Sequence, residues 1–270
     1  MTPKTAIAIA AHPDDIELKM AGTLLLLKEA GWDIHYFNLS SGNGGSLEHG
    51  ADETAAIRRE EAQEAARRLG ARWHPPIADD LLIFYQESLL RQVAAVIREV
   101  RPSIVLTHPL EDYMEDHTET ARLAVTASFA HCVRNFRSSP DMPAYFHDVT
   151  VYHCMPHGGQ DPLRRPVTPA SWVNTTSVHP IAREALAAHL SQGGWLDATQ
   201  GQSSYLESMD EHAKNVGKQS GAFEFAEGWW RHLHVGFSAH DIDPLADALG
   251  ENYLVNASFE KSIKTNLSIH

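Results

Sequence analysis

The hydrophobic and polar positions in the first half of the chain alternate between strand-like and helix-like patterns. Short apolar runs predict strands over residues 5–11, 33–40, 102–108 and 148–155. Periodic apolar positions between them predict helices over residues 16–30, 52–69, 88–100 and 117–135. Gly31 and Gly70 stand where helix C-termini are expected. Strands that alternate with helices in this way are typical of a parallel sheet with right-handed crossovers.

This alternation predicts an α/β fold: a Rossmann-like three-layer sandwich with a mostly parallel sheet and its site at the carboxyl ends of the strands. The second half is less regular, with a Gly/Pro-rich loop over 156–171 and expected helices over 178–190 and 203–219. Since no repeat, low-complexity tract or long linker interrupts the chain, residues 1–250 are expected to form one domain. The polar residues 251–270 are expected to form a peripheral C-terminal arm.

Composition narrows the range of partners. The 270 residues include 22 Lys and Arg against 35 Asp and Glu, for a net charge of -13. This acidity argues against nucleic acid and favours a neutral or polar small molecule. The two cysteines, Cys132 and Cys154, form no CxxC motif, so neither a disulfide framework nor a thiolate metal site is expected. The apolar runs are too short for a signal peptide or a membrane span, and we expect a cytoplasmic protein without membrane insertion.

Two clusters of imidazole and carboxylate groups follow predicted strands. The stretch IAIAAHPDDIEL (7–18) ends the first strand with His12, Asp14 and Asp15. The stretch THPLEDYMEDH (107–117) does the same after the strand at 102–108. The first cluster alone would more often be a structural turn, but the carboxyl ends of parallel strands share one edge of the sheet. The pair of clusters therefore favours a metal site.

The residue types suit a catalytic divalent metal. Such a zinc site typically takes three protein ligands from His and carboxylate and leaves one position for water. HPDD supplies His12 and Asp15, and His117 at the start of a helix is the best-placed third ligand. Asp14 would then face the bound water as its general base. Iron(II) or another divalent metal also suits two histidines and one carboxylate.

These segments also resemble a known family. AHPDDIE, IRREEAQEAARRLG (57–70) and Asp116–His117 resemble the PIG-L/LmbE-like metal-dependent N-deacetylases, and FAEGWW (225–230) is similar to a motif near that family's end. The resemblance covers most of residues 5–135. It implies that His12, Asp15 and His117 bind zinc, that Asp14 is the general base, and that Arg58 lies near the substrate.

The resemblance also implies a function. Members of the family remove N-acetyl groups from N-acetylglucosamine-type sugars and their conjugates, so it implies a zinc-dependent hydrolase acting on a small N-acetylated molecule. Because the family often forms trimers or hexamers, it also implies a homo-oligomer.

One position departs from the family pattern. The second motif usually reads His-Pro-Asp-His, whereas this chain has Met114-Glu115-Asp116-His117. A methionine thioether is only a weak acceptor, so Met114 can neither stabilise an oxyanion nor protonate a leaving amine. His157, in a Gly-rich loop after a strand, is the first candidate to replace the missing acid, with His108 second. Alternatively, Asp14 passes on the proton that it takes from water.

The remaining candidates have more than one interpretation. His108 ends a strand and is expected either to contact the substrate or to be structural. Tyr113 either donates its phenol to an oxyanion or packs on the surface. Asp116 is expected to support the metal ligands from behind.

Three functions fit the sequence to different degrees. The first is the deacetylase, and the second is a non-catalytic, metal-stabilised carbohydrate-binding protein that lost its acid with Met114. The third, a nucleotide-binding protein, is disfavoured because no Gly-rich turn follows the first strand. Asp14 would be of no use to a mere binder, so its presence favours the enzyme.

Overall fold

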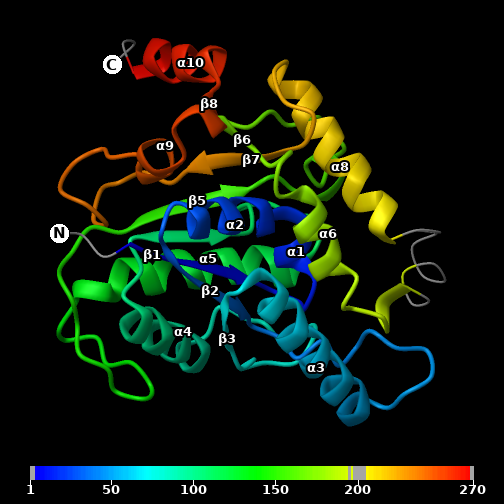
Figure 1. The fold of residues 1–270 in the computed structure, drawn as a ribbon. Helices are drawn as coiled ribbons and strands as arrows, with labels where there is room; N and C mark the ends of the chain where they lie inside the picture. The colour runs from blue at the N-terminus through cyan, green and yellow to red at the C-terminus, as the bar shows by residue number, and fades with distance from the viewer. Residues whose placement is uncertain (1–3, 194–195, 197–204, 268–270) are drawn as a thin grey trace.

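A single mixed sheet forms the centre of the protein (Figure 1). The computed structural model describes residues 4–193, 196 and 205–267, and within these residues the sheet has eight strands. The strand order is β3-β2-β1-β4-β5-β7-β6-β8. The first five in this order are parallel: β1 (Thr5–Ala10), β2 (Asp33–Asn38), β3 (Arg72–His74), β4 (Ile104–Thr107) and β5 (Thr150–Cys154). The other three are antiparallel: β7 (Ala226–Arg231), β6 (Ser171–Asn174) and β8 (Tyr253–Val255).

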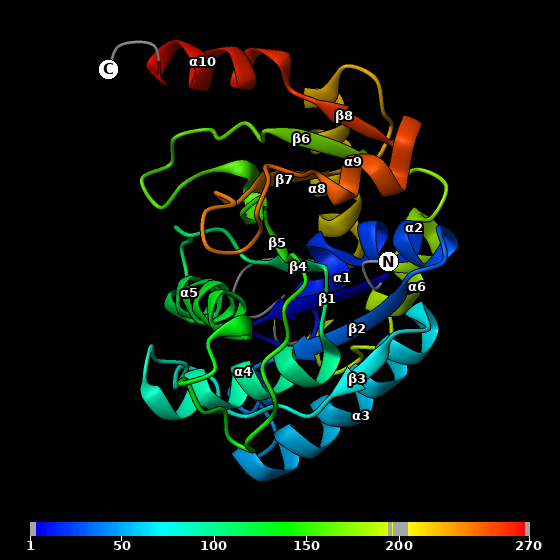
Figure 2. The ribbon, with the colours of Figure 1, turned by 90° about the vertical axis from the view of Figure 1, so that its left-hand side faces the viewer.

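Helices cover both faces of the sheet, as Figure 2 shows. One face carries α4 (Glu87–Val100) and α5 (Glu115–Phe129). The other carries α1 (Asp15–Lys19), α2 (Ala21–Glu29), α3 (Ala51–Leu69), α6 (His179–Leu186) and α8 (Tyr205–Ser220). Alternate residues of β1 enter the two cores, Ile7 on the α4–α5 side and Ala8 on the other. The expected three-layer α/β sandwich with a mostly parallel sheet is therefore confirmed.

The helix expected over 16–30 is interrupted at Met20, which separates α1 from α2. The Glu227 carboxylate on β7 accepts hydrogen bonds from the backbone N–H groups of Gly22 (2.7 Å) and Thr23 (2.9 Å). These groups lie in the first turn of α2, where backbone donors have no partner within the helix. A carboxylate from a distant strand thus caps a new helix start, which local periodicity does not indicate.

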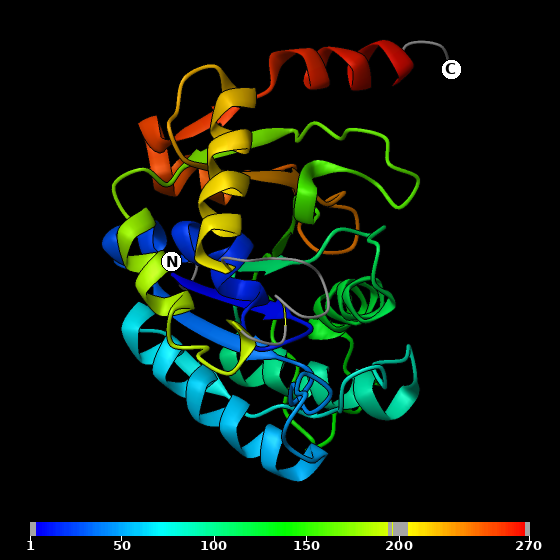
Figure 3. The same cartoon turned by 90° about the vertical axis from the view of Figure 1, so that its right-hand side faces the viewer.

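The second half contains more strand than the pattern predicts. β6, β7 and β8 complete the sheet beyond β5, and α8 packs beside β7 and α6 (Figure 3). Residues 253–255 of the segment expected to be an arm form the edge strand β8, and α10 (Ala257–Leu267) follows it. Residues 203–204, where the last internal helix was expected to begin, lie outside the described residues.

The described helices include no candidate membrane span. None of those in the described part of the chain combines the length and the apolar character that a membrane span requires.

Candidate metal centre

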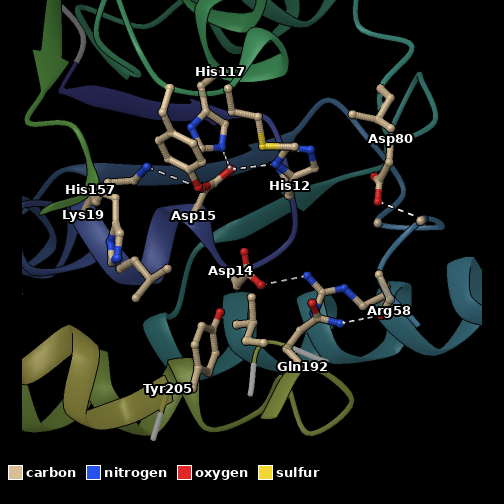
Figure 4. A pocket seen from close by; sticks show the side chains of 18 residues that line it. His12, Asp14, Asp15, Lys19, Arg58, Asp80, His117, His157, Gln192 and Tyr205 are labelled. Carbon is tan, nitrogen blue, oxygen red and sulfur yellow. Dashed lines mark hydrogen bonds and ion pairs between the residues drawn. The ribbon is translucent and has the colours of Figure 1, made fainter. Parts of the chain in front are cut away.

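The two predicted clusters meet at one edge of the sheet. β1 and β4 are parallel neighbours, so the residues after Ala10 and those after Thr107 emerge side by side. Asp14 adopts a left-handed backbone conformation, with φ of 111°, that is strained for a residue other than glycine. This turn starts α1 at Asp15. His12, Asp14, Asp15 and His117 line a pocket of about 250 Å³ there (Figure 4).

His12, Asp15 and His117 present their ligand atoms to one another. Asp15 Oδ2 lies 3.3 Å from both His12 Nδ1 and His117 Nε2, and a possible ligand atom from each residue lies within 4.8 Å of the others. The second ring nitrogen of each histidine meets another carboxylate. His12 Nε2 lies 3.0 Å from Asp116 Oδ2, and His117 Nδ1 lies 3.0 Å from Asp112 Oδ1. Histidines that bind metals commonly have such an outer carboxylate partner, so the three residues fit a divalent cation.

Electrostatics also favour a cation at this point. Burial alone would lower the pKa of His12, but its hydrogen bonds to Asp116 and Asp15 raise that pKa to about 10. Burial opposes ionisation of Asp15 as well, yet the charges of His117 and Lys19 hold its pKa well below the usual range. The buried carboxylates therefore stabilise positive charge between the two histidines.

Asp14 lies beside the three candidate ligands and has a separate partner. Arg58 on α3, which is 2% exposed, donates from Nη2 to Asp14 Oδ2 (2.9 Å) and to the carbonyl of Pro13. Gly42 lies directly over this arginine, since a Cβ there would come within 2.8 Å of Arg58 Nε. The loop after β2 and helix α3 thus hold the guanidinium against the Asp14 carboxylate.

The other predicted residues divide into those that line the pocket and those behind it. Tyr113 and His157 line it, and burial lowers the pKa of His157. His108 is fully buried and is not among the residues that line the pocket, which favours the structural one of its two expected roles. Its ring stacks on His117 with centroids 4.1 Å apart, while Nε2 accepts a hydrogen bond from Ala11 N (2.9 Å). His108 therefore packs against the candidate ligand His117 from the buried side.

Asp116 lies behind the ligands, where its Oδ2 also accepts a hydrogen bond from Leu81 N (2.7 Å). Met114 lines the pocket. The side chain that lacks the acid function therefore faces the site itself.

Several residues in or beside the pocket have little or no sequence signal. Lys19 is 3% exposed and places Nζ 3.4 Å from Asp15 Oδ1. In the sequence, only its spacing of four residues from Asp15 on a predicted helix indicates that the two side chains are neighbours. Asp112 supports His117 from the connection after β4. Tyr205 comes from α8 and points its buried hydroxyl toward Asp14, without a hydrogen-bond partner among the described residues (Figure 4). The remote origin of Tyr205 explains why the pattern around HPDD could not reveal it.

Fold and site together define an α/β protein with a candidate metal centre at the carboxyl ends of parallel strands. Residues 7–128 match the model of the PIG-L family, described as GlcNAc-PI de-N-acetylase. The motifs predict this match, which covers a little under half of the chain. Deacetylases of this family act on N-acetylglucosamine-type substrates.

Two curated relatives have different activities. A diacetylchitobiose deacetylase of Thermococcus kodakarensis is 31% identical over 143 residues, which are 50% of this chain and 53% of the relative. A 4-oxalmesaconate hydratase of Pseudomonas putida is 34% identical over 132 residues, which are 46% of this chain and 51% of the relative. The chain thus spans about half the length of the curated relatives it matches, and those relatives include both a hydrolase and a hydratase.

A solved structure supports the fold over nearly the whole chain. The N,N'-diacetylchitobiose deacetylase of Pyrococcus horikoshii superposes with a TM-score of 0.71 and 22% identity, covering 90% of this chain and 88% of that one.

Proposed function

We propose that this protein is a metal-dependent hydrolase that removes the N-acetyl group from an N-acetylglucosamine-type sugar or its conjugate. The observation that carries the proposal is the position of Asp14: it lies beside the candidate ligands, faces the pocket, and is held by Arg58. The family match and the deacetylase relative support this reaction class.

Zn²⁺ is the proposed metal, with Fe²⁺ or another divalent ion as alternatives, and His12, Asp15 and His117 would hold it. A bound divalent metal would supply a Lewis acid for the acetamide oxygen and lower the pKa of a water molecule. Asp14 would accept a proton from the attacking water. That proton would then reach the amide nitrogen as the C–N bond breaks, which gives the free amine and acetate.

His157 remains the proposed proton donor to the leaving nitrogen, because it lines the pocket near the metal ligands. Burial lowers its pKa, so only a minor fraction would be protonated at neutral pH. His157→Ala is expected to lower kcat by about tenfold or more and to remove the alkaline limb of the pH–rate profile. Unchanged kcat and an unchanged profile would instead assign proton return to Asp14 alone.

Hydration of a double bond is a second candidate function, favoured by the similarity to a hydratase. Adding water to an alkene releases no amine, but it places a proton on one carbon and a hydroxyl on the other. A donor other than Met114, such as protonated Asp14, would have to supply that proton. The hydratase relative is consistent with this alternative.

The test is a screen of N-acetylated amino sugars and their conjugates for amine release, with and without a chelator, alongside unsaturated acids for hydration. Amine release that stops with chelator and returns with Zn²⁺ is the expected result. Hydration without amine release would replace the proposed function. Metal and sugar binding with no turnover of either class would favour the non-catalytic carbohydrate-binding protein.

A further inference from the structure

Lys19 is a buried cation that the proposed reaction does not use directly. It lies on the last turn of α1 and lines the pocket, although its side chain is almost fully enclosed. Burial disfavours its ammonium form, but the negative charge of Asp15 raises the pKa of Lys19 above the usual value, and the nearby Asp112 contributes. Lys19 therefore stays charged and is compensated by carboxylates of the candidate metal centre.

The two oxygens of the Asp15 carboxylate face different partners. Oδ2 lies 3.3 Å from both His12 Nδ1 and His117 Nε2, whereas Oδ1 lies 3.4 Å from Lys19 Nζ. Ligand atoms at about 2.0–2.1 Å from a tetrahedral zinc are separated from one another by roughly 3.3–3.4 Å. Oδ2 is thus spaced from the two imidazoles as a metal ligand would be, and Oδ1 is paired with the ammonium.

Lys19 is held at this oxygen by its place in the fold. It follows Asp15 by four residues on the same helix, so the two side chains lie on one face of α1. Figure 4 shows Lys19 and His12 on opposite sides of the Asp15 carboxylate. Asp112, the second carboxylate whose charge acts on Lys19, has its Oδ1 3.0 Å from His117 Nδ1. The ammonium is thus fixed beside the carboxylate of one candidate ligand and near the carboxylate that supports another.

The number of Asp15 oxygens that bind the metal decides what else can bind it. A carboxylate can coordinate a cation through one oxygen or through both. A catalytic zinc site takes three protein ligands and keeps its fourth position for water or substrate. A contact from Asp15 Oδ1 would compete for that position. It would also have to displace the Lys19 ammonium, which would leave a buried charge without its ion-pair partner.

We propose that Lys19 is a positioning residue: its ammonium keeps Oδ1 of Asp15 away from the metal, so that Asp15 binds through Oδ2 alone and one coordination position stays open. This inference deepens the proposed function and rests on it only for the metal centre, not for the acetylated substrate.

The test uses Co²⁺ as a spectroscopic probe in place of Zn²⁺. The visible absorption of Co²⁺ is intense in a four-coordinate site and weakens as further ligand atoms bind. The wild type is expected to give the intense spectrum. Lys19→Met is expected to bind Co²⁺ at least as tightly, since it frees Oδ1 and removes a like charge beside the metal, but to give a weaker spectrum. Its turnover should fall about tenfold or more, because the open position is filled.

Lys28→Met is the matched control. Lys28 lies on the neighbouring helix α2 and donates to the carbonyl of Leu69 (3.1 Å), outside the pocket, so its loss should leave Co²⁺ affinity and spectrum unchanged. If Lys19→Met does not fold, Lys19→Gln carries the same expectation, because glutamine has no charge with which to hold Oδ1. If neither folds, the wild-type spectrum decides.

A weak wild-type spectrum would overturn the assignment, as would a Lys19 variant that binds Co²⁺ with the wild-type spectrum. Loss of Co²⁺ from the Lys19 variants would overturn it too, because Lys19 would then only hold the site together. The spectra require no substrate. Absence of amine release together with the expected spectra would therefore count against the proposed function alone, whereas a wild type that binds no Co²⁺ would remove both.

Discussion

Asp14→Asn is expected to keep its metal and to lose about 10²- to 10⁴-fold of its turnover, the range that general-base catalysis typically provides. The loss corresponds to roughly 3–5 kcal/mol in the activation barrier. Asparagine has nearly the volume of aspartate, and its carbonyl oxygen can still accept the hydrogen bond from Arg58 Nη2. What it cannot do is take a proton from water.

The substitution separates the base from the ligand set. Asp14 is absent from the group of side chains whose ligand atoms converge, whereas Asp15, its neighbour, belongs to that group. Metal content by elemental analysis should therefore equal that of the wild type while kcat falls with the most active substrate of the screen. Turnover within twofold of the wild type would remove Asp14 from the role of base.

Asp80→Asn provides a matched control in the same pocket. Asp80 accepts hydrogen bonds from Ser40 Oγ (2.6 Å) and Gly44 N (2.9 Å), which ties it to the loop after β2. It is a pocket carboxylate without a ligand or base role, so its variant should keep both metal and most of the turnover. A collapse as deep as that of Asp14→Asn would mean that loss of any pocket carboxylate disables the site.

The central part of the fold could be predicted because it depends on local rules. Buried parallel strands give apolar runs such as IVLT, and parallel strands place the residues after them at one edge of the sheet. That rule predicts that His12, Asp15 and His117 meet at this edge of the sheet. The antiparallel strands β6 and β8, of four and three residues, are too short to give a distinct alternation.

The surroundings of the site depended on tertiary contacts that no local pattern contains. His108 was expected either to contact substrate or to be structural, and the sequence could not decide between the two, because only the structure shows that its ring stacks on His117. Tyr205 reaches the pocket from a helix almost 200 residues after HPDD. Lys19 is a helical neighbour of Asp15 in the sequence, yet only the structure shows that its side chain is buried beside that carboxylate. Oligomeric state and cellular location stay predictions from sequence.

Asp15→Asn is expected to abolish stable metal binding. An amide oxygen carries no net charge, so the site would keep two histidines and lose the anion between them. Either substitution removes the charge that pairs with Lys19, which could cost about 3–5 kcal/mol of folding stability. Alanine would be a poorer choice, because it would in addition leave a cavity at this position. The amide retains the volume of the side chain.

Two measurements test whether Asp15→Asn has lost metal binding. After dialysis in Zn²⁺ and removal of free metal, the wild type should retain close to one equivalent and the variant a small fraction of it. Added Zn²⁺ should raise the melting temperature of the wild type, because a ligand of the native state stabilises it by mass action, and should not raise that of the variant. Glu115→Gln is the control: Glu115 is an exposed acid two residues before His117, and its loss should leave both readouts unchanged. A full equivalent of zinc on Asp15→Asn would mean that the metal is held elsewhere, the buried group of His108, Asp112 and His117 being the next set to test.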